Sequence, residues 1–359
     1  MGLQKNIVYS AVLTCSTYLV PLLVFPYISR VLGVDGIGAV DFVDSVINYC
    51  VLLSMMGMTT LGVREIARNK SNPVLLQQAF ADLFSLNLLS TLVVLFVLAL
   101  MICLVPQLWD KKELFCIGAI KLVANLFWIE WFFKGIENFR YITIRSVVLR
   151  LLFICFVYLL VHEEQDYGVY YFLFVSLTLG NAIFNWNFRK RYIGCSLRHV
   201  DIKRYAKPFF RLGGFAVLSS VYTQLITVWL GLQCGETEVG YYTTSTRLHQ
   251  VIIALFSTLT SVIIPRMSVL FKENRLTDVR QLTEKAFQIL FLFAFPVFSF
   301  MEFFASDLIS LIAGPGFEAA VFPMRIVVFQ VFIIGTEQIC ILQILIPMQT
   351  ERAILRAAI

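Results

Sequence analysis

Apolar stretches long enough to cross a bilayer alternate with short polar segments from one end of the chain to the other. An α-helix needs about 20 residues to span roughly 30 Å of hydrocarbon. The pattern therefore predicts an all-α polytopic membrane protein with about ten transmembrane helices. The predicted spans are 7–31, 38–62, 80–105, 114–134, 142–161, 167–187, 208–232, 239–264, 285–312 and 320–346.

The composition supports a lipid-embedded chain. Of its 359 residues, 59% are hydrophobic and 14% are charged, and the mean hydropathy is +0.80. A soluble domain with so little polar surface could not cover its own exterior. The net charge of +6 is divided among short loops without an interleaved aromatic surface, so we expect no nucleic-acid partner. The eight cysteines are scattered without paired spacing, and we expect neither a metal site nor a disulfide framework.

The loop cations predict the orientation of the chain. Only Lys111 and Lys112 fall in predicted outer turns, whereas the other loop lysines and arginines fall in predicted inner segments. This bias predicts a cytoplasmic N-terminus. The first apolar run is too long for a signal-peptide core and lacks a cleavage site, so we expect it to be retained as a helix.

The two halves of the sequence carry the same landmarks in the same order. An LG pair at 32–33, Gly38 and Arg64 in the first half match an LG pair at 230–231, Gly240 and Arg266 in the second. Such a parallel repeat predicts two lobes with the substrate site between them. We expect a six-helix lobe at 1–187, a basic cytoplasmic linker at 188–207 and a second lobe at 208–359. The last residues, ERAILRAAI, read as the start of a further helix, so we expect the second lobe to be incomplete.

Polar side chains form matching stripes on one predicted helix of each half. Intramembrane ionisable groups face a cavity or a partner, because exposing one to lipid near the bilayer centre costs about 2.5–3.5 kcal/mol on insertion scales. The stripes therefore predict a polar cavity. Their members are Asp41, Asp44 and Asn48 in the first half, and Thr243, Thr246, Arg247 and Gln250 in the second.

Several charged residues have a structural interpretation beside the functional one. Asp41 and Asp44 lie near a predicted interface, and Arg247 has a stem long enough to reach one. Arg30 is either an interfacial anchor or a ligand, and Arg64 suits a helix C-terminus on the cytoplasmic side.

The sequence also gives expectations for three further charged residues. We expect Lys121 and Arg150 to pair with Glu130, Asp41 or Glu302, and we expect Asp35 to be solvated.

Enzymatic signatures do not accompany these features. The sequence holds no GxxxxGK[ST], HExxH or GxSxG pattern, so we expect a transporter without a bound cofactor rather than an enzyme.

Taken together, the repeated positive-inside lobe, the PYISRVLGVDGIG turn, the FFKGIENFRYITIRS junction and the basic linker resemble the polysaccharide flippases. These are the Wzx-type members of the multidrug/oligosaccharidyl-lipid/polysaccharide (MOP) superfamily, which is MATE-like in fold. The resemblance covers the whole chain. Family members have 12 to 14 helices, so it also implies that the last helices are missing here.

The resemblance implies a function. An undecaprenyl-diphosphate-linked oligosaccharide would move from the inner to the outer leaflet of a bacterial cytoplasmic membrane by alternating access, alongside glycosyltransferases and a polysaccharide polymerase. By position in related lipid II flippases, Arg30, Arg64 and Arg247 match cavity arginines. The matching acidic residue is Asp41 or Asp44, which the resemblance casts in proton or sodium coupling. Arginine suits a diphosphate, and Asn48, Thr243, Thr246 and Gln250 would bind sugar.

Other functions remain open at this point. A multidrug or cation antiporter of the same superfamily would favour acidic and aromatic cavity residues, and a lipid II flippase would share the arginines. A membrane-embedded glycan polymerase would need a large outer loop, and a fragment without transport activity would need none of these groups.

Overall fold

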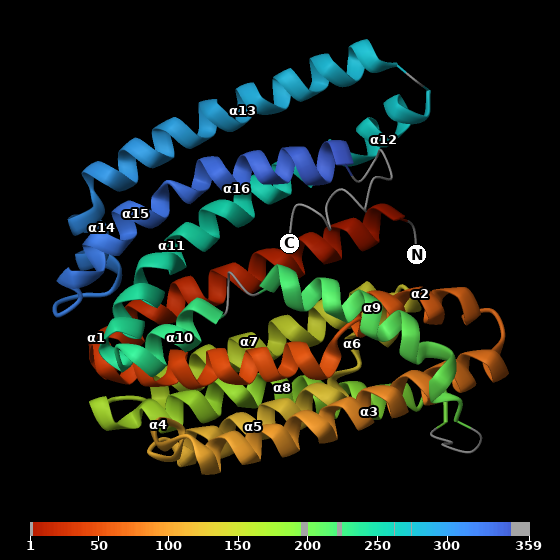
Figure 1. The fold of residues 1–359 in the computed structure, drawn as a ribbon, viewed down its shortest axis with the longest axis horizontal. Helices are drawn as coiled ribbons and strands as arrows, with labels where there is room; N and C mark the ends of the chain where they lie inside the picture. Colours follow the sequence, from red (N-terminus) through yellow and green to blue (C-terminus); the bar gives the residue numbers. More distant parts are fainter. Residues whose placement is uncertain (1–2, 195–199, 221–224, 262, 274, 346–359) are drawn as a thin grey trace. The chain divides into compact units, whose positions relative to one another are not determined.

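The computed structural model describes residues 3–194, 200–220, 225–261, 263–273 and 275–345. Within these ranges the chain contains helices and no strand (Figure 1). It divides into two units, Met1–Val239 and Gly240–Ile359. The predicted boundaries at 187 and 207 stay a prediction. The sequence predicted for a further helix, ERAILRAAI, lies outside the described residues.

The first unit consists of helices that run in alternating directions. The elements are α1 (Leu3–Met55), α2 (Met58–Asn69), α3 (Pro73–Leu104), α4 (Pro106–Trp109), α5 (Lys112–Trp128), α6 (Glu130–Gly135), α7 (Phe139–Leu160), a 3₁₀ turn (Glu164–Asp166), α8 (Tyr167–Arg189), α9 (Ile202–Ser220) and α10 (Ile226–Gln233). Helix α5 packs against α1, α3 and α8, while α7 packs against α1 and α8 (Figure 1).

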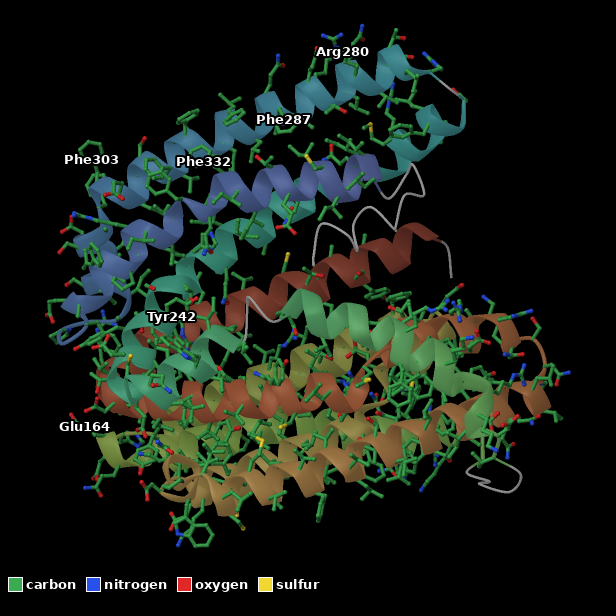
Figure 2. The ribbon with its side chains drawn as sticks, viewed as in Figure 1. Glu164, Tyr242, Arg280, Phe287, Phe303 and Phe332 are labelled. Atoms are coloured by element: carbon green, nitrogen blue, oxygen red, sulfur yellow. The ribbon has the colours of Figure 1, made fainter. Side chains whose placement is uncertain are left out.

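The second unit is built from helices that begin with α11 (Glu236–Ser261), whose first turn still belongs to the first unit. The others are α12 (Ile264–Lys272), α13 (Leu276–Phe303), α14 (Ala305–Ile312), a 3₁₀ turn (Glu318–Ala320), α15 (Val321–Val328), α16 (Gln330–Gln338) and a π-helical stretch (Ile339–Leu345). Helix α13 packs against α15 and α16. Phe332, labelled on α16 in Figure 2, lies with its ring centroid 5.1 Å from that of Phe295.

The apolar pattern located the helices well. Seven helical stretches among the described residues are long and apolar enough to cross a membrane. The first, Val8–Asn69, contains the first two predicted spans, and the other six coincide with predicted spans. The remaining two predictions correspond to α9 with α10, and to α11.

The predicted turn between the first two spans is confirmed, and it falls at Gly33. Two helices that run in opposite directions meet there under the single label α1 (Figure 1), and within Leu3–Met55 only Gly33 leaves helical geometry, with φ 66° and ψ −176°. An L side chain disfavours that backbone region, which glycine adopts freely. Gly36 and Gly38 instead lie buried within the helix. The helix that follows Gly33 ends earlier than predicted. It stops at Met55, Met56 has a φ of 37°, and α2 starts at Met58.

Both halves interrupt the helix that carries the polar stripe and continue with a short helix. Helix α1 is followed by α2, which carries Arg64, and α11 is followed by α12, which carries Arg266. A long helix then follows in each half, as α3 and α13. This shared order agrees with the repeat that the sequence landmarks indicate.

Local signals fix several helix starts. Asn72 caps α3, because its side-chain oxygen accepts hydrogen bonds from the Val74 and Leu75 amides at 3.0 and 3.3 Å, and Pro73 occupies the first helical position. Asn138 caps α7 by accepting from the Tyr141 amide at 3.3 Å. Such caps satisfy backbone donors that have no partner inside the helix.

An aromatic core lies among α2, α3 and α6 in the first unit. Phe80 stacks on Phe84 and Trp131 with ring centroids 5.8 and 5.5 Å apart. The buried guanidinium of Arg189 lies 3.7 Å from the Trp186 ring centroid, a cation–π arrangement. This end of the unit is thereby a packed base for the helices that carry the polar groups.

Glycine allows α1 and α5 to approach closely at Gly118. A methyl group there would lie 2.5 Å from Ile47 Cγ1 and 3.0 Å from the Tyr171 hydroxyl oxygen, and Ile47 is fully buried. We therefore predict that Gly118→Ala lowers the free energy of unfolding by about 1 kcal/mol, since an overpacking cost of roughly 1–3 kcal/mol exceeds the gain of about 1 kcal/mol in helix propensity.

The matched control is Gly168→Ala on α8, where a methyl group would meet nothing within 4 Å. Unfolding of the detergent-solubilised protein would measure both variants. Equal stability of Gly118→Ala and Gly168→Ala would contradict the close approach of α1 and α5.

Candidate functional site

Four polar side chains meet inside the first unit. Lys121 Nζ donates to Asp44 Oδ1 at 2.6 Å and to Asn48 Oδ1 at 2.8 Å. Asn48 Nδ2 donates to Asp44 Oδ2 at 2.8 Å, and the Tyr171 hydroxyl donates to Asp44 Oδ1 at 3.2 Å. We name Asp44, Asn48, Lys121 and Tyr171 the interior polar cluster.

Three helices position this cluster. Asp44 and Asn48 are one turn apart on α1, so both side chains lie on the same face. Lys121 comes from α5, one turn after Gly118, and Tyr171 comes from α8. The Lys121 ammonium also lies 5.0 Å from the Phe174 ring centroid on α8. The cluster therefore joins α1, α5 and α8 through charge as well as packing.

Charge pairing explains how these groups are tolerated in an apolar surrounding. The side chains of Lys121 and Asp44 are only 12% and 14% exposed. Carrying one of these charges alone would cost several kcal/mol, whereas a paired and hydrogen-bonded ion pair offsets much of that cost. Both carboxylate oxygens of Asp44 have partners, so the charge is satisfied within the protein.

The structure corrects the predicted partners of the deep cations. Lys121 pairs with Asp44, which was not among the three expected acids. Arg150 instead donates to the Leu13 carbonyl at 3.1 Å and the Thr17 hydroxyl at 2.8 Å, and also to Ser16. It thereby holds the first part of α1 against α7.

The other two acids from that prediction have local partners. Glu130 pairs with Lys134 at 2.7 Å, which confirms the predicted i, i+4 ion pair. Glu302 lies 3.6 Å from Arg325 in the second unit.

Asp41 sits one turn before Asp44 on the same helix. Its side chain is half-buried, and its backbone carbonyl accepts a hydrogen bond from the Ser45 hydroxyl at 2.7 Å. The sequence alone left Asp41 and Asp44 equivalent, whereas the structure places Asp44 in an ion pair with Lys121.

The segment around Gly33 carries its own contacts. Arg30 is exposed and donates to the Pro26 carbonyl one turn earlier. Asp35 is exposed, as expected, and it also accepts a hydrogen bond from the Thr237 hydroxyl at 2.6 Å. Lys111 pairs at 2.9 Å with Glu236, the residue before Thr237. These contacts link the part of α1 next to Gly33 and the N-terminal end of α5 to the start of α11.

Arg64 lies on α2, the short helix after the stripe. It is exposed, and its Nε donates to the carboxylate of Glu65 at 3.1 Å. It does not close a long helix, as the sequence suggested, because α2 continues to Asn69.

The second-unit candidates all lie on α11. The hydroxyls of Thr243 and Thr246 donate to carbonyls of their own helix, Gly240 at 3.5 Å and Thr243 at 3.0 Å. Arg247 is half-buried and Gln250 is exposed. These hydroxyls therefore have partners and can also accept a hydrogen bond from a ligand.

Sequence reasoning missed several buried polar groups. Tyr171 was not a candidate, although a tyrosine in an apolar run is a known way to hold a carboxylate. On α11 it also passed over the buried Ser245 and His249. In the second turn of α7, the buried Arg145 donates to Asn185 and to the Ser146 hydroxyl at 3.1 Å. Local spacing does not predict the pairing of Tyr171 with Asp44 or of Arg145 with Asn185, because in each pair the two residues lie on different helices.

The ion pair yields a test of the cluster. Lys121→Met would leave Asp44 charged and unpaired, so we predict a loss of about 3 kcal/mol in the free energy of unfolding. The double variant Asp44→Asn/Lys121→Met should recover most of that loss, because it buries no unpaired charge. Thermal unfolding of the purified protein would measure the cycle. Additive losses in the double variant would mean that the two side chains are not coupled.

Comparison with known proteins places this geometry in context. A profile described as polysaccharide biosynthesis protein matches residues 3–271. A protein of Escherichia coli strain K12 named as an O-antigen transporter is 26% identical over 350 residues, which is 96% of this chain and 84% of that protein. A Shigella dysenteriae protein of the same name is 24% identical over 280 residues, which is 74% of this chain and 67% of that one.

Solved structures share the fold. An inward-facing multidrug resistance MATE family transporter of the MOP superfamily aligns with a TM-score of 0.58 at 16% identity, over 90% of this chain and 84% of that one. A crystal structure of a MATE P26A mutant aligns with a TM-score of 0.50 at 15% identity, over 94% and 96% of the two chains. The chain is thus a multi-pass membrane protein with a MATE-like fold, and it belongs to the polysaccharide biosynthesis protein family.

Proposed function

We propose that this protein moves an undecaprenyl-diphosphate-linked oligosaccharide from the inner to the outer leaflet of a bacterial cytoplasmic membrane by alternating access. The observation that carries the proposal is the similarity to two O-antigen transporters along most of the chain. The positive-inside bias of the loops supports a cytoplasmic N-terminus.

The polar groups of α11 support a glycan headgroup as the substrate. Arg247 supplies a planar donor fork suited to phosphate oxygens. Thr243, Thr246 and Gln250 lie on adjacent turns of the same helix, and their hydroxyl and amide groups can form hydrogen bonds with sugar hydroxyls. The prenyl chain would remain in lipid while these groups handle the headgroup. Arg30 on α1 and Arg64 on α2 are both exposed and add positive charge at two other places in the first unit.

The interior polar cluster argues against export of organic cations. A carboxylate that binds such a cation must be available to it, whereas Asp44 already accepts from Lys121, Asn48 and Tyr171. The MATE-like fold alone does not favour a multidrug function, since a fold supports many functions.

The same cluster supports a role in coupling. In our proposal, a proton or a sodium ion that binds Asp44 or Asp41 competes with the Lys121 ammonium and changes the relative stability of two states. Such a shift requires different ion affinities in the two states. Lys121 would act as an internal cation that occupies the site when the ion is absent.

The substrate proposal can be tested in a strain that lacks its own repeat-unit flippase. We predict that Arg247→Ala reduces surface glycan at least tenfold while membrane abundance stays normal, because a phosphate contact to arginine is worth about 1.5–3 kcal/mol. The matched control is Arg280→Ala, whose exposed side chain pairs with Glu284 at 2.9 Å (Figure 2). Normal surface glycan with Arg247→Ala would remove this residue from the site.

The coupling proposal needs variants that leave no unpaired charge. We predict that Asp41→Asn/Asp44→Asn/Lys121→Met loses the dependence of transport on an imposed proton or sodium gradient. Wild-type protein in the same vesicles supplies the comparison. Gradient-driven transport that persists at the wild-type rate in the triple variant would eliminate both aspartates from coupling.

A further inference from the structure

A groove opens between α7 and α8 at the outer face of the first unit, away from the interior polar cluster. Its cavity volume is about 590 Å³. Apolar side chains line its length, among them Val148 and Leu152 on α7 and Phe184 on α8. These three side chains are about half exposed, so each presents apolar surface to whatever fills the groove.

Arginines lie at one end of this groove. Arg140 is in the first turn of α7 and Arg191 lies two residues after the end of α8, which places both at the same end of two antiparallel helices. Both are exposed and both line the groove. Leu152 is twelve residues beyond Arg140 and therefore about 18 Å further along the helix. That length is close to one leaflet, since half of the hydrocarbon core is about 15 Å.

A third arginine is built into the base of the groove. The Arg145 side chain is only 4% exposed and lines the same cavity. Its guanidinium lies 5.4 Å from the Tyr141 ring centroid. Among the described residues, its Nε has no hydrogen-bond partner. Because Arg145 also donates to Asn185 and to the Ser146 hydroxyl, it contributes its charge to the groove rather than a direct contact with a ligand.

The surrounding acids do not cancel this positive charge. Glu130 lies 3.9 Å from Arg145, but it is shared with Lys134 at 2.7 Å. Glu137, on the turn before α7, pairs with Lys70 at 3.0 Å. The end of the groove that carries the arginines therefore keeps a net positive charge, next to the apolar lining of the rest of the groove.

We propose that this groove binds an anionic membrane phospholipid. One acyl chain lies along Val148, Leu152 and Phe184, and the phosphate lies against Arg140 and Arg191, near the buried charge of Arg145. The positive charge of the arginines favours an anionic headgroup. The apolar lining of the groove, which is about as long as one leaflet, favours an acyl chain attached to that headgroup. The site is separate from the groups assigned to the transported glycan, so its presence does not depend on which substrate the protein carries.

The test measures lipid binding to the purified full chain in detergent by native mass spectrometry. Phosphatidylglycerol and phosphatidylcholine with identical chains are the probes. The phosphate end is removed in Arg140→Gln/Arg191→Gln. The charge-matched control is Lys203→Gln/Arg211→Gln, which changes two exposed cations of α9. The floor is blocked in Leu152→Trp.

We expect wild-type protein to prefer phosphatidylglycerol, the arginine double variant to bind it at least about tenfold more weakly, and the control to bind it as wild type does. Leu152→Trp should weaken binding of the same lipid. The proposal is overturned if the control loses as much affinity as the arginine variant, or if the arginine variant binds as wild type does. It is also overturned if inorganic phosphate displaces the lipid at equal concentration, because the acyl chain would then contribute nothing.

Discussion

The ion pair between Asp44 and Lys121 is the constraint on which the interior of the first unit depends. A carboxylate among apolar helices is stable only with a partner, and here the partner comes from a different helix. Pairing requires α1 and α5 to approach closely, and Gly118 permits that approach. Tyr171 then extends the contact to α8. Charge, helix spacing and helix rotation are therefore set together.

The two halves use the same helix order with different chemistry. Helix α1 carries Asp44, whose charge is neutralised by Lys121 inside the protein, whereas α11 carries an arginine and hydroxyls that donate to their own helix. The same helix order with different polar groups allows the two halves to perform different tasks. In our proposal, the first half responds to an ion and the second half recognises the anionic headgroup.

Much of the helix arrangement was predictable because apolar length is a local property of the sequence. The side-chain partners were less predictable. Lys121 could not be assigned to Asp44 from spacing, because the rotation of α5 about its axis decides which residue of α1 it meets. The turn itself was predictable from its three glycines, of which only Gly33 has a positive φ. The spacing of the glycines did not say which of the three would leave helical geometry. The stripe on α1 was read correctly in part, since Asp44 and Asn48 do hydrogen-bond to each other.

The central claim is that the protein moves a lipid-linked glycan between leaflets. The most direct measurement uses the purified chain in sealed vesicles that contain a fluorescent polyprenyl-diphosphate oligosaccharide, with a membrane-impermeant quencher added outside. Transport predicts that the fraction of probe reached by the quencher rises well above one half in vesicles with protein, and stays near one half in vesicles without it. An accessible fraction that is identical with and without protein, under every imposed ion gradient, would contradict the claim.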